Sequence, residues 1–129
     1  MNKTETMFDF EKLDVYKKAY ELNQKLYRMI KTNHAIAPYI KNLLGRASFS
    51  TMLNIAEGSA SFNKKIKKSF YIKARTAVFE CASLISFLHD EGEISDEIKE
   101  ELWASCEAVS RMLFIMVNHL SGRFEWKEL

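Results

Sequence analysis

Glycine, proline and cysteine are scarce in this 129-residue chain, which has four, one and two of them, while 47% of its residues are hydrophobic. This length and composition suit one domain with one substantial core. We therefore expect residues 1–129 to form a single domain. Cys81 and Cys106 fall in helical apolar rows, where we expect buried free thiols rather than a disulfide.

The chain also lacks a long apolar run. Its longest one, residues 112–117, is far shorter than the roughly 20 residues that a transmembrane helix needs. The first ten residues mix Asp, Glu and Lys with Phe, so they do not resemble a secretion signal. We therefore expect a cytoplasmic protein that does not bind membranes.

Motifs for catalysis and metal binding are absent from the sequence. No Glu-x-x-His pair of the kind that di-iron bundles use occurs, and the three histidines share no metal-ligand spacing. There is no Gly-rich phosphate loop and no nucleophile elbow. Glu57 and Glu80 are the remaining acid–base candidates, but Glu57 fits better as an acceptor for amides that open the next helix. We expect no metal, no cofactor and no enzymatic activity.

Four segments have apolar residues at alternating steps of three and four, which predicts four helices. Pro38 suits a first helical turn, Gly58 suits a helix end, and Ser95 suits an N-cap. The expected helices span about residues 10–31, 38–57, 64–91 and 96–121. Because the connections are short, we predict an all-α fold, an antiparallel up-down-up-down four-helix bundle.

The second predicted helix has an inward row that becomes polar toward its end. This row comprises Leu43, Ala47, Ser50, Asn54 and Glu57. We expect Asn54 and Glu57 to hold the junction with the third helix, and Gly58 to end the second.

Several large apolar residues point away from the predicted inward rows. They are Phe49, Met52, Ile72, Phe79 and Ile115. Scattered apolar groups are ordinary on a protein surface, but five of them on three helices favour contacts between subunits. We therefore expect a homo-oligomer.

Charge is distributed unevenly along the chain. The formal net charge is +2 for residues 1–40, +7 for residues 41–75 and −7 for residues 76–129. Four of the positive charges gather at the start of the third helix, where the helix dipole opposes them, and Arg75 follows further along the same helix. These candidate phosphate-binding residues, with one arginine in the second helix, are Lys64, Lys65, Lys67, Lys68, Arg75 and Arg46.

Lys64, Lys68 and Arg75 share one helical stripe, which we expect to point outward toward a phosphate backbone. A solvated face that keeps an oligomer soluble is the alternative interpretation. In the predicted topology, Arg123 and Lys127 lie near these lysines, and the acidic residues 90–101 lie at the opposite end. No base-reading element is visible, so binding would follow backbone and shape more than sequence.

The block Asn54-Ile55-Ala56-Glu57-Gly58 resembles a motif of bacterial proteins encoded in 23S rRNA intervening sequences, a family that includes accessory proteins of diversity-generating retroelements. The resemblance covers nearly the whole chain, including residues 10–27. It also includes Arg46, Ala47, Ser50, Phe70, Ala74, Glu80 and Gly92. The chain departs from the family at Gly45, where a second arginine is common, and at Met52, where a proline is common.

The resemblance implies a homopentamer of bundles around a central channel, with a positively charged surface. For the retroelement members it implies binding to nucleic acid, either RNA or DNA, and to a reverse transcriptase. Our leading hypothesis is a non-enzymatic oligomeric bundle that binds nucleic acid. The alternative is a protein-interaction scaffold, in which tyrosines of the first helix or the acidic end bind a partner.

Overall fold

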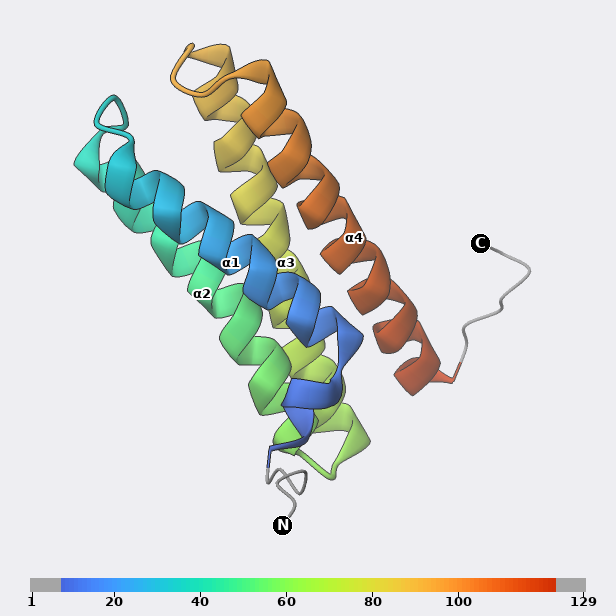
Figure 1. Cartoon of the computed structure of the whole chain (residues 1–129). Coiled ribbons are helices and arrows are strands. Elements are labelled where there is room, and N and C mark those ends of the chain that lie inside the picture. Colours follow the sequence, from blue (N-terminus) through green and yellow to red (C-terminus); the bar gives the residue numbers. More distant parts are fainter. Residues whose placement is uncertain (1–7, 123–129) are drawn as a thin grey trace.

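A computed structural model of the chain describes residues 8–122, which form a short 3-10 helix and four long helices. The elements are η1 (Asp9–Lys12), α1 (Asp14–Thr32), α2 (Pro38–Ala60), α3 (Lys64–Asp90) and α4 (Asp96–Ser121). Consecutive helices run in opposite directions, so the fold is an antiparallel four-helix bundle, as predicted (Figure 1). Within residues 8–122, no helix combines the length and apolar character needed to cross a membrane.

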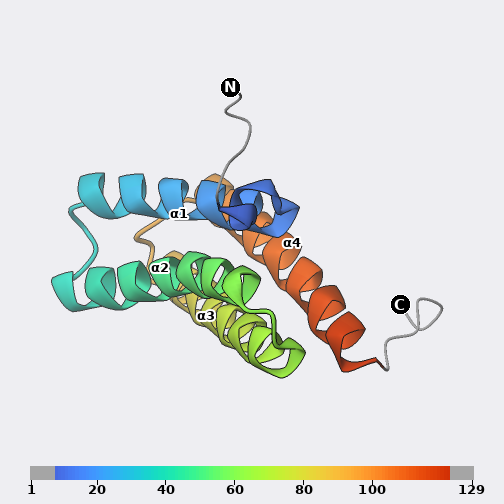
Figure 2. The ribbon, with the colours of Figure 1, turned by 90° about the horizontal axis from the view of Figure 1, so that it is seen from below.

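Each helix packs against two others. α1 contacts α2 and α4, and α3 contacts the same two helices. Figure 2 shows that α4 diverges from α1 toward its C-terminal end. Met116 and Leu120, two apolar residues near this end of α4, are accordingly only half-buried.

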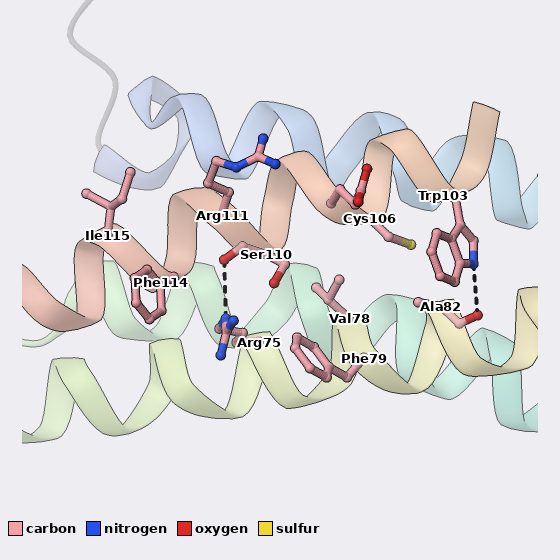
Figure 3. Close-up of a pocket in the computed structure, with 11 residues that line it drawn as sticks. Arg75, Val78, Phe79, Ala82, Trp103, Cys106, Ser110, Arg111, Phe114 and Ile115 are labelled. Carbon is pink, nitrogen blue, oxygen red and sulfur yellow. Dashed lines mark hydrogen bonds between the residues drawn. The ribbon is translucent and has the colours of Figure 1, made fainter. Parts of the chain in front are cut away.

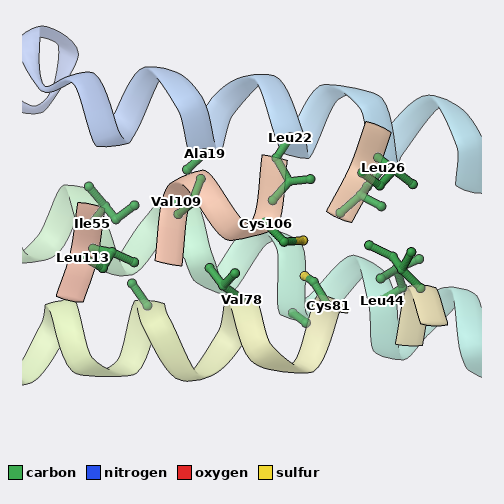
Figure 4. Close-up of a cluster of buried hydrophobic side chains, with 14 of the residues drawn as sticks. Ala19, Leu22, Leu26, Leu44, Ile55, Val78, Cys81, Cys106, Val109 and Leu113 are labelled. Atoms are coloured by element: carbon green, nitrogen blue, oxygen red, sulfur yellow. The ribbon is translucent and has the colours of Figure 1, made fainter. Parts of the chain in front are cut away.

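The core runs along the bundle axis between the four helices (Figure 4). Its fully covered side chains include Leu22, Leu44, Ile85 and Leu113, one from each helix. Cys81 and Cys106 are free and buried in this cluster, as expected, and burial raises the pKa of each thiol to about 12. Neither thiol is therefore suited to act as a nucleophile.

Of the predicted inward row of α2, only Ala47 is fully buried. The structure instead buries Ile40, Leu44, Ala47, Ser48, Thr51, Ile55 and Gly58. Leu43 and Glu57 are exposed. Ser48 and Thr51 can enter the core because Ser48 donates a hydrogen bond to Asn23 of α1, and Thr51 donates one to the Ala47 carbonyl at 3.0 Å. The predicted row contained neither of these two residues.

Gly58 does not end α2, which continues to Ala60. A Cβ atom at this position would lie 2.6 Å from Cε1 of the buried Tyr71 and 3.2 Å from Cβ of Phe70. The glycine therefore permits a close approach of α2 to α3. Gly58 was predicted to end a helix because glycine readily adopts the left-handed conformation. Gly92 after α3 and Gly122 after α4 do so instead, since both have a positive φ.

Candidate nucleic-acid and subunit interfaces

The connection from α2 to α3 is held by side chains of the loop itself. Asn63 is the N-cap of α3, and its side chain accepts a hydrogen bond from the Ile66 amide at 3.0 Å. Ser61 Oγ accepts a hydrogen bond from the Asn63 amide at 3.2 Å. The three-residue loop between α2 and α3 is therefore fixed on both sides of Phe62.

Lys67 belongs to this junction and not to an open surface. Its ammonium donates hydrogen bonds to the carbonyls of Gly58 at 2.9 Å and Ser59 at 3.4 Å, which lie in the last turn of α2. It also lies 5.8 Å from the centre of the Tyr71 ring. A cation at a helix C-terminus is favoured by the helix dipole, so Lys67 has a structural role in place of the predicted phosphate contact.

The other lysines of the run differ in their surroundings. Lys68 is half-buried and donates a hydrogen bond to Ser121 of α4 at 3.2 Å, which places the start of α3 beside the end of α4. Lys64 and Lys65 are exposed, and neither bonds to another side chain within residues 8–122. The predicted neighbours Arg123 and Lys127 lie outside the described residues.

Asn54 and Glu57 do not cap the start of α3 in the described structure. Asn54 donates hydrogen bonds within its own helix, to the Ser50 carbonyl at 2.8 Å and hydroxyl at 3.0 Å. Glu57 is exposed on the last turns of α2. The role predicted for these residues is filled by Asn63 and Lys67.

Arg75 lies in the α3–α4 groove, on the outer face between those helices (Figure 3). Its guanidinium carbon lies 4.8 Å from the centre of the Phe79 ring and 5.2 Å from that of Phe114, and its Nε donates to the Ser110 carbonyl at 3.3 Å. The sequence predicted that the stripe of Lys64, Lys68 and Arg75 points freely outward. This prediction is wrong for Lys68 and Arg75, which bond to α4. The stripe follows the boundary with α4.

The α3–α4 groove has a volume of about 670 Å³, and three aromatic residues are among those that line it. Phe79, Phe114 and Trp103 line it and remain exposed, Phe79 to 54%. Trp103 is held by a hydrogen bond from its indole nitrogen to the Ala82 carbonyl at 3.2 Å. A second hollow beside it adds Ile72 and Val117, so the apolar surface continues toward the end of α4.

The other residues predicted at subunit interfaces occupy different surroundings. Phe49 and Ile72 are exposed, as expected, and Ile115 is half-buried on the rim of the α3–α4 groove. Met52 is turned toward α1, where its sulfur accepts a hydrogen bond from Asn23 at 3.4 Å. Met52 was therefore wrongly expected to point outward, because the predicted inward row of α2 was rotated.

Arg46 is exposed near the middle of α2 and lines a hollow between α2 and α3 together with Glu80. It lies twelve residues before Gly58, which is about 18 Å along a helix. Arg46 is therefore separate from the lysines at the start of α3.

The opposite end of the bundle carries the cluster of acidic residues within residues 90–101. Ser95 is the N-cap of α4, as predicted, and Asp96 and Glu97 follow in its first turn. His89 pairs with Asp96, and this hydrogen bond raises the pKa of the histidine. Among residues 8–122, no three metal-ligating side chains cluster together.

Comparison with protein families identifies the chain. Residues 11–114 match the model of the 23S rRNA-intervening sequence protein family. The chain belongs to this family. The resemblance noted in the block from Asn54 to Gly58 is thereby confirmed.

This member of the 23S rRNA-intervening sequence protein family has the same fold as a solved structure from the S23 ribosomal protein family. That structure is of a protein of unknown function from Bacteroides thetaiotaomicron. The TM-score is 0.77 at 16% sequence identity, and the match covers 80% of this chain and 97% of the other. No curated protein matches the chain.

Proposed function

We propose that this chain is a non-enzymatic, homo-oligomeric bundle that binds nucleic acid, with Lys64 and Lys65 as its principal phosphate contacts. The observation that carries the proposal is the pair of exposed lysines in the first turn of α3, a turn that contains no acidic residue. Positive charges at this position oppose the helix dipole. Fold stability does not explain them, whereas a polyanionic partner does.

The family supports RNA as the first ligand to test, because its members are named for intervening sequences of 23S rRNA. A cytoplasmic location would place the protein with such RNA. A reverse transcriptase partner stays a prediction from the resemblance to retroelement proteins.

Titration of a labelled structured RNA at several salt concentrations tests the electrostatic mechanism. We expect affinity to fall steeply with salt, and the double variant Lys64→Glu/Lys65→Glu to lose at least about tenfold in affinity. The matched control is Arg28→Glu/Lys31→Glu. It makes the same charge change on exposed residues near the C-terminal end of α1, away from the start of α3. Affinity that ignores salt, or equal losses in both variants, would contradict specific contacts at α3.

The α3–α4 groove favours self-association, with a second copy of the chain as its occupant. The groove carries both Arg111 and Glu107 beside its aromatic residues, so it offers apolar area together with charges of both signs. Surfaces that combine aromatic residues with arginine are typical of protein interfaces. The family resemblance makes a pentamer the expected assembly.

Light scattering of the purified protein tests self-association. We expect Phe79→Asp to release smaller species, because it places a charge in the groove. Phe87→Asp is the matched control, since Phe87 is equally exposed on α3 but does not line the groove. A monodisperse wild-type monomer would refute the oligomer. An oligomer purified without nucleic acid that also ignores added RNA would favour the scaffold alternative.

A further inference from the structure

We propose that Phe62, together with Lys64 and Lys65, forms a stacking site for the bases of single-stranded nucleic acid. This inference rests on the proposed function and specifies the form of nucleic acid that the basic end of α3 prefers. Phe62 has a relative exposure of 103%, so the rest of the described chain leaves its side chain uncovered. Other exposed aromatic residues, such as Phe79, lie against neighbouring side chains.

Hydrogen bonds hold the loop on both sides of this residue. On one side, the Ser61 amide donates to the Gly58 carbonyl at 3.2 Å, which closes the end of α2. On the other side, Asn63 caps α3 through the Ile66 amide. Only the side-chain torsions of Phe62 remain to be ordered when a base stacks on it, so little conformational freedom is lost on binding.

Positive charge follows the ring within three residues. Lys64 and Lys65 are exposed, and Glu57 is the exposed carboxylate at the end of α2 that partly offsets them. An aromatic platform beside lysines is the combination with which proteins bind single strands, because every base has a face that can stack and every nucleotide has a phosphate. A duplex hides the faces of its bases in its own stack, so Phe62 adds affinity only where bases are unpaired.

A contact with another protein is the competing explanation for an exposed phenylalanine. Phe62 lies apart from the surface proposed for self-association, since Arg75, the first residue of α3 that lines the α3–α4 groove, follows Lys64 by eleven residues, about 16 Å along α3. Lys64 and Lys65 follow Phe62 by two and three residues, whereas charged residues are depleted in the centres of protein interfaces. These observations favour nucleic acid.

Fluorescence anisotropy tests the proposal with two probes, an oligo-uridine of about 20 nucleotides and an RNA duplex of equal length. We expect Phe62→Ala to weaken binding of the single strand about tenfold, to change duplex binding less than about twofold, and to leave the salt dependence unaltered. Phe62→Trp should retain the affinity for the single strand. Lys64→Ala/Lys65→Ala should weaken both probes and reduce the salt dependence.

Several outcomes would overturn the stacking site. If Phe62→Ala leaves single-strand binding unchanged, or weakens both probes equally, base stacking is refuted while the proposed function stands. If Phe62→Ala lowers the molar mass seen by light scattering, the residue serves a protein contact instead. If the wild-type protein binds neither probe, the proposed function fails as well, so the two failures are distinguishable.

Discussion

The two ends of the bundle carry opposite charges, and the two sets of charges differ in what they do for the fold. At the end formed by the α3–α4 connection, Asp96 and Glu97 lie in the first turn of α4, where the helix dipole stabilises them. At the other end, Lys64 and Lys65 lie in the first turn of α3, where the same dipole destabilises them. Folding therefore accounts for the acidic end but not for the basic one.

The loops at the two ends of the bundle also differ in their contacts. Near the acidic end, Asn33 after α1 donates a hydrogen bond to the Glu93 carbonyl at 2.9 Å, which joins two loops. At the basic end, Lys67 bonds to the end of α2, and Phe62 projects into solvent. Within one run of lysines, the structure thus separates a residue that holds the fold from residues that do not.

A larger side chain at Gly58, where α2 approaches α3 closely, should have the largest effect on stability. We expect Gly58→Ala to lower the free energy of unfolding by about 2–3 kcal/mol, because the new methyl group overlaps the buried Tyr71 ring. The matched control is Gly45→Ala in the same helix, whose methyl group would meet only Ile30, at 3.8 Å. It should raise stability by roughly 0.5–1 kcal/mol. Urea denaturation measures both, and equal effects would contradict the close packing.

Replacing Arg75 tests whether this residue binds RNA with the lysines of α3 or stabilises the packing of α3 against α4. We expect Arg75→Ala to lower the free energy of unfolding by about 1–2 kcal/mol, because it loses the contacts with two phenylalanine rings and the Ser110 carbonyl. RNA affinity should change less than about threefold. Arg111→Ala, on the exposed rim of the same groove, is the control for stability. A loss of RNA binding without destabilisation would restore the role predicted from sequence.

Reversing the charges at each end should move stability in opposite directions. We expect Lys64→Glu/Lys65→Glu to raise the free energy of unfolding by about 0.5–1 kcal/mol while RNA binding falls. Asp96→Lys/Glu97→Lys should lower it by a similar amount and leave RNA binding intact. Thermal and urea denaturation at low ionic strength provide the measurement. Destabilisation by the first variant would mean that the lysines do contribute to folding.

The smallest expected effect is a pH dependence from His89 at the acidic end. Its hydrogen bond to Asp96 raises the pKa in the folded protein, so the folded state binds the proton more tightly than the unfolded state does. The added stability is fully present below the unfolded pKa of about 6.5 and is lost as pH rises through the raised folded pKa. Denaturation series at several pH values should show a flatter profile for His89→Gln. Identical slopes would refute the pairing.

Much of the fold was predictable from sequence because the spacing of apolar residues determines helices directly. The bounds expected for the four helices agree with the structure to within a few residues. The first helix differs most, since η1 ends at Lys12 and the extended Leu13 separates it from α1. The inward row predicted for α2 was wrong, because the structure buries the polar side chains of Ser48 and Thr51.

The candidate sites were harder to predict, because a lysine in a sequence carries no sign of its partner. Lys67 bonds to carbonyls of the preceding helix, and Arg75 packs between rings that are four and thirty-nine residues away in the chain. Phe62 was overlooked because it lies in a loop, where the spacing of apolar residues that predicts helices gives no information. An isolated aromatic residue between a serine and a helix-capping asparagine was the available signal.

The hydrogen bond between Asn23 and Ser48 has a consequence for how α1 and α2 can align. Asn23 is buried, and its amide is satisfied only where Ser48 and Met52 lie opposite it. Sliding α1 by one turn in either direction would move Ser48 or Met52 away from this amide and leave one of its polar atoms without that partner in a buried position. One buried side chain therefore favours a single register for the first hairpin over other alignments of the same apolar surfaces.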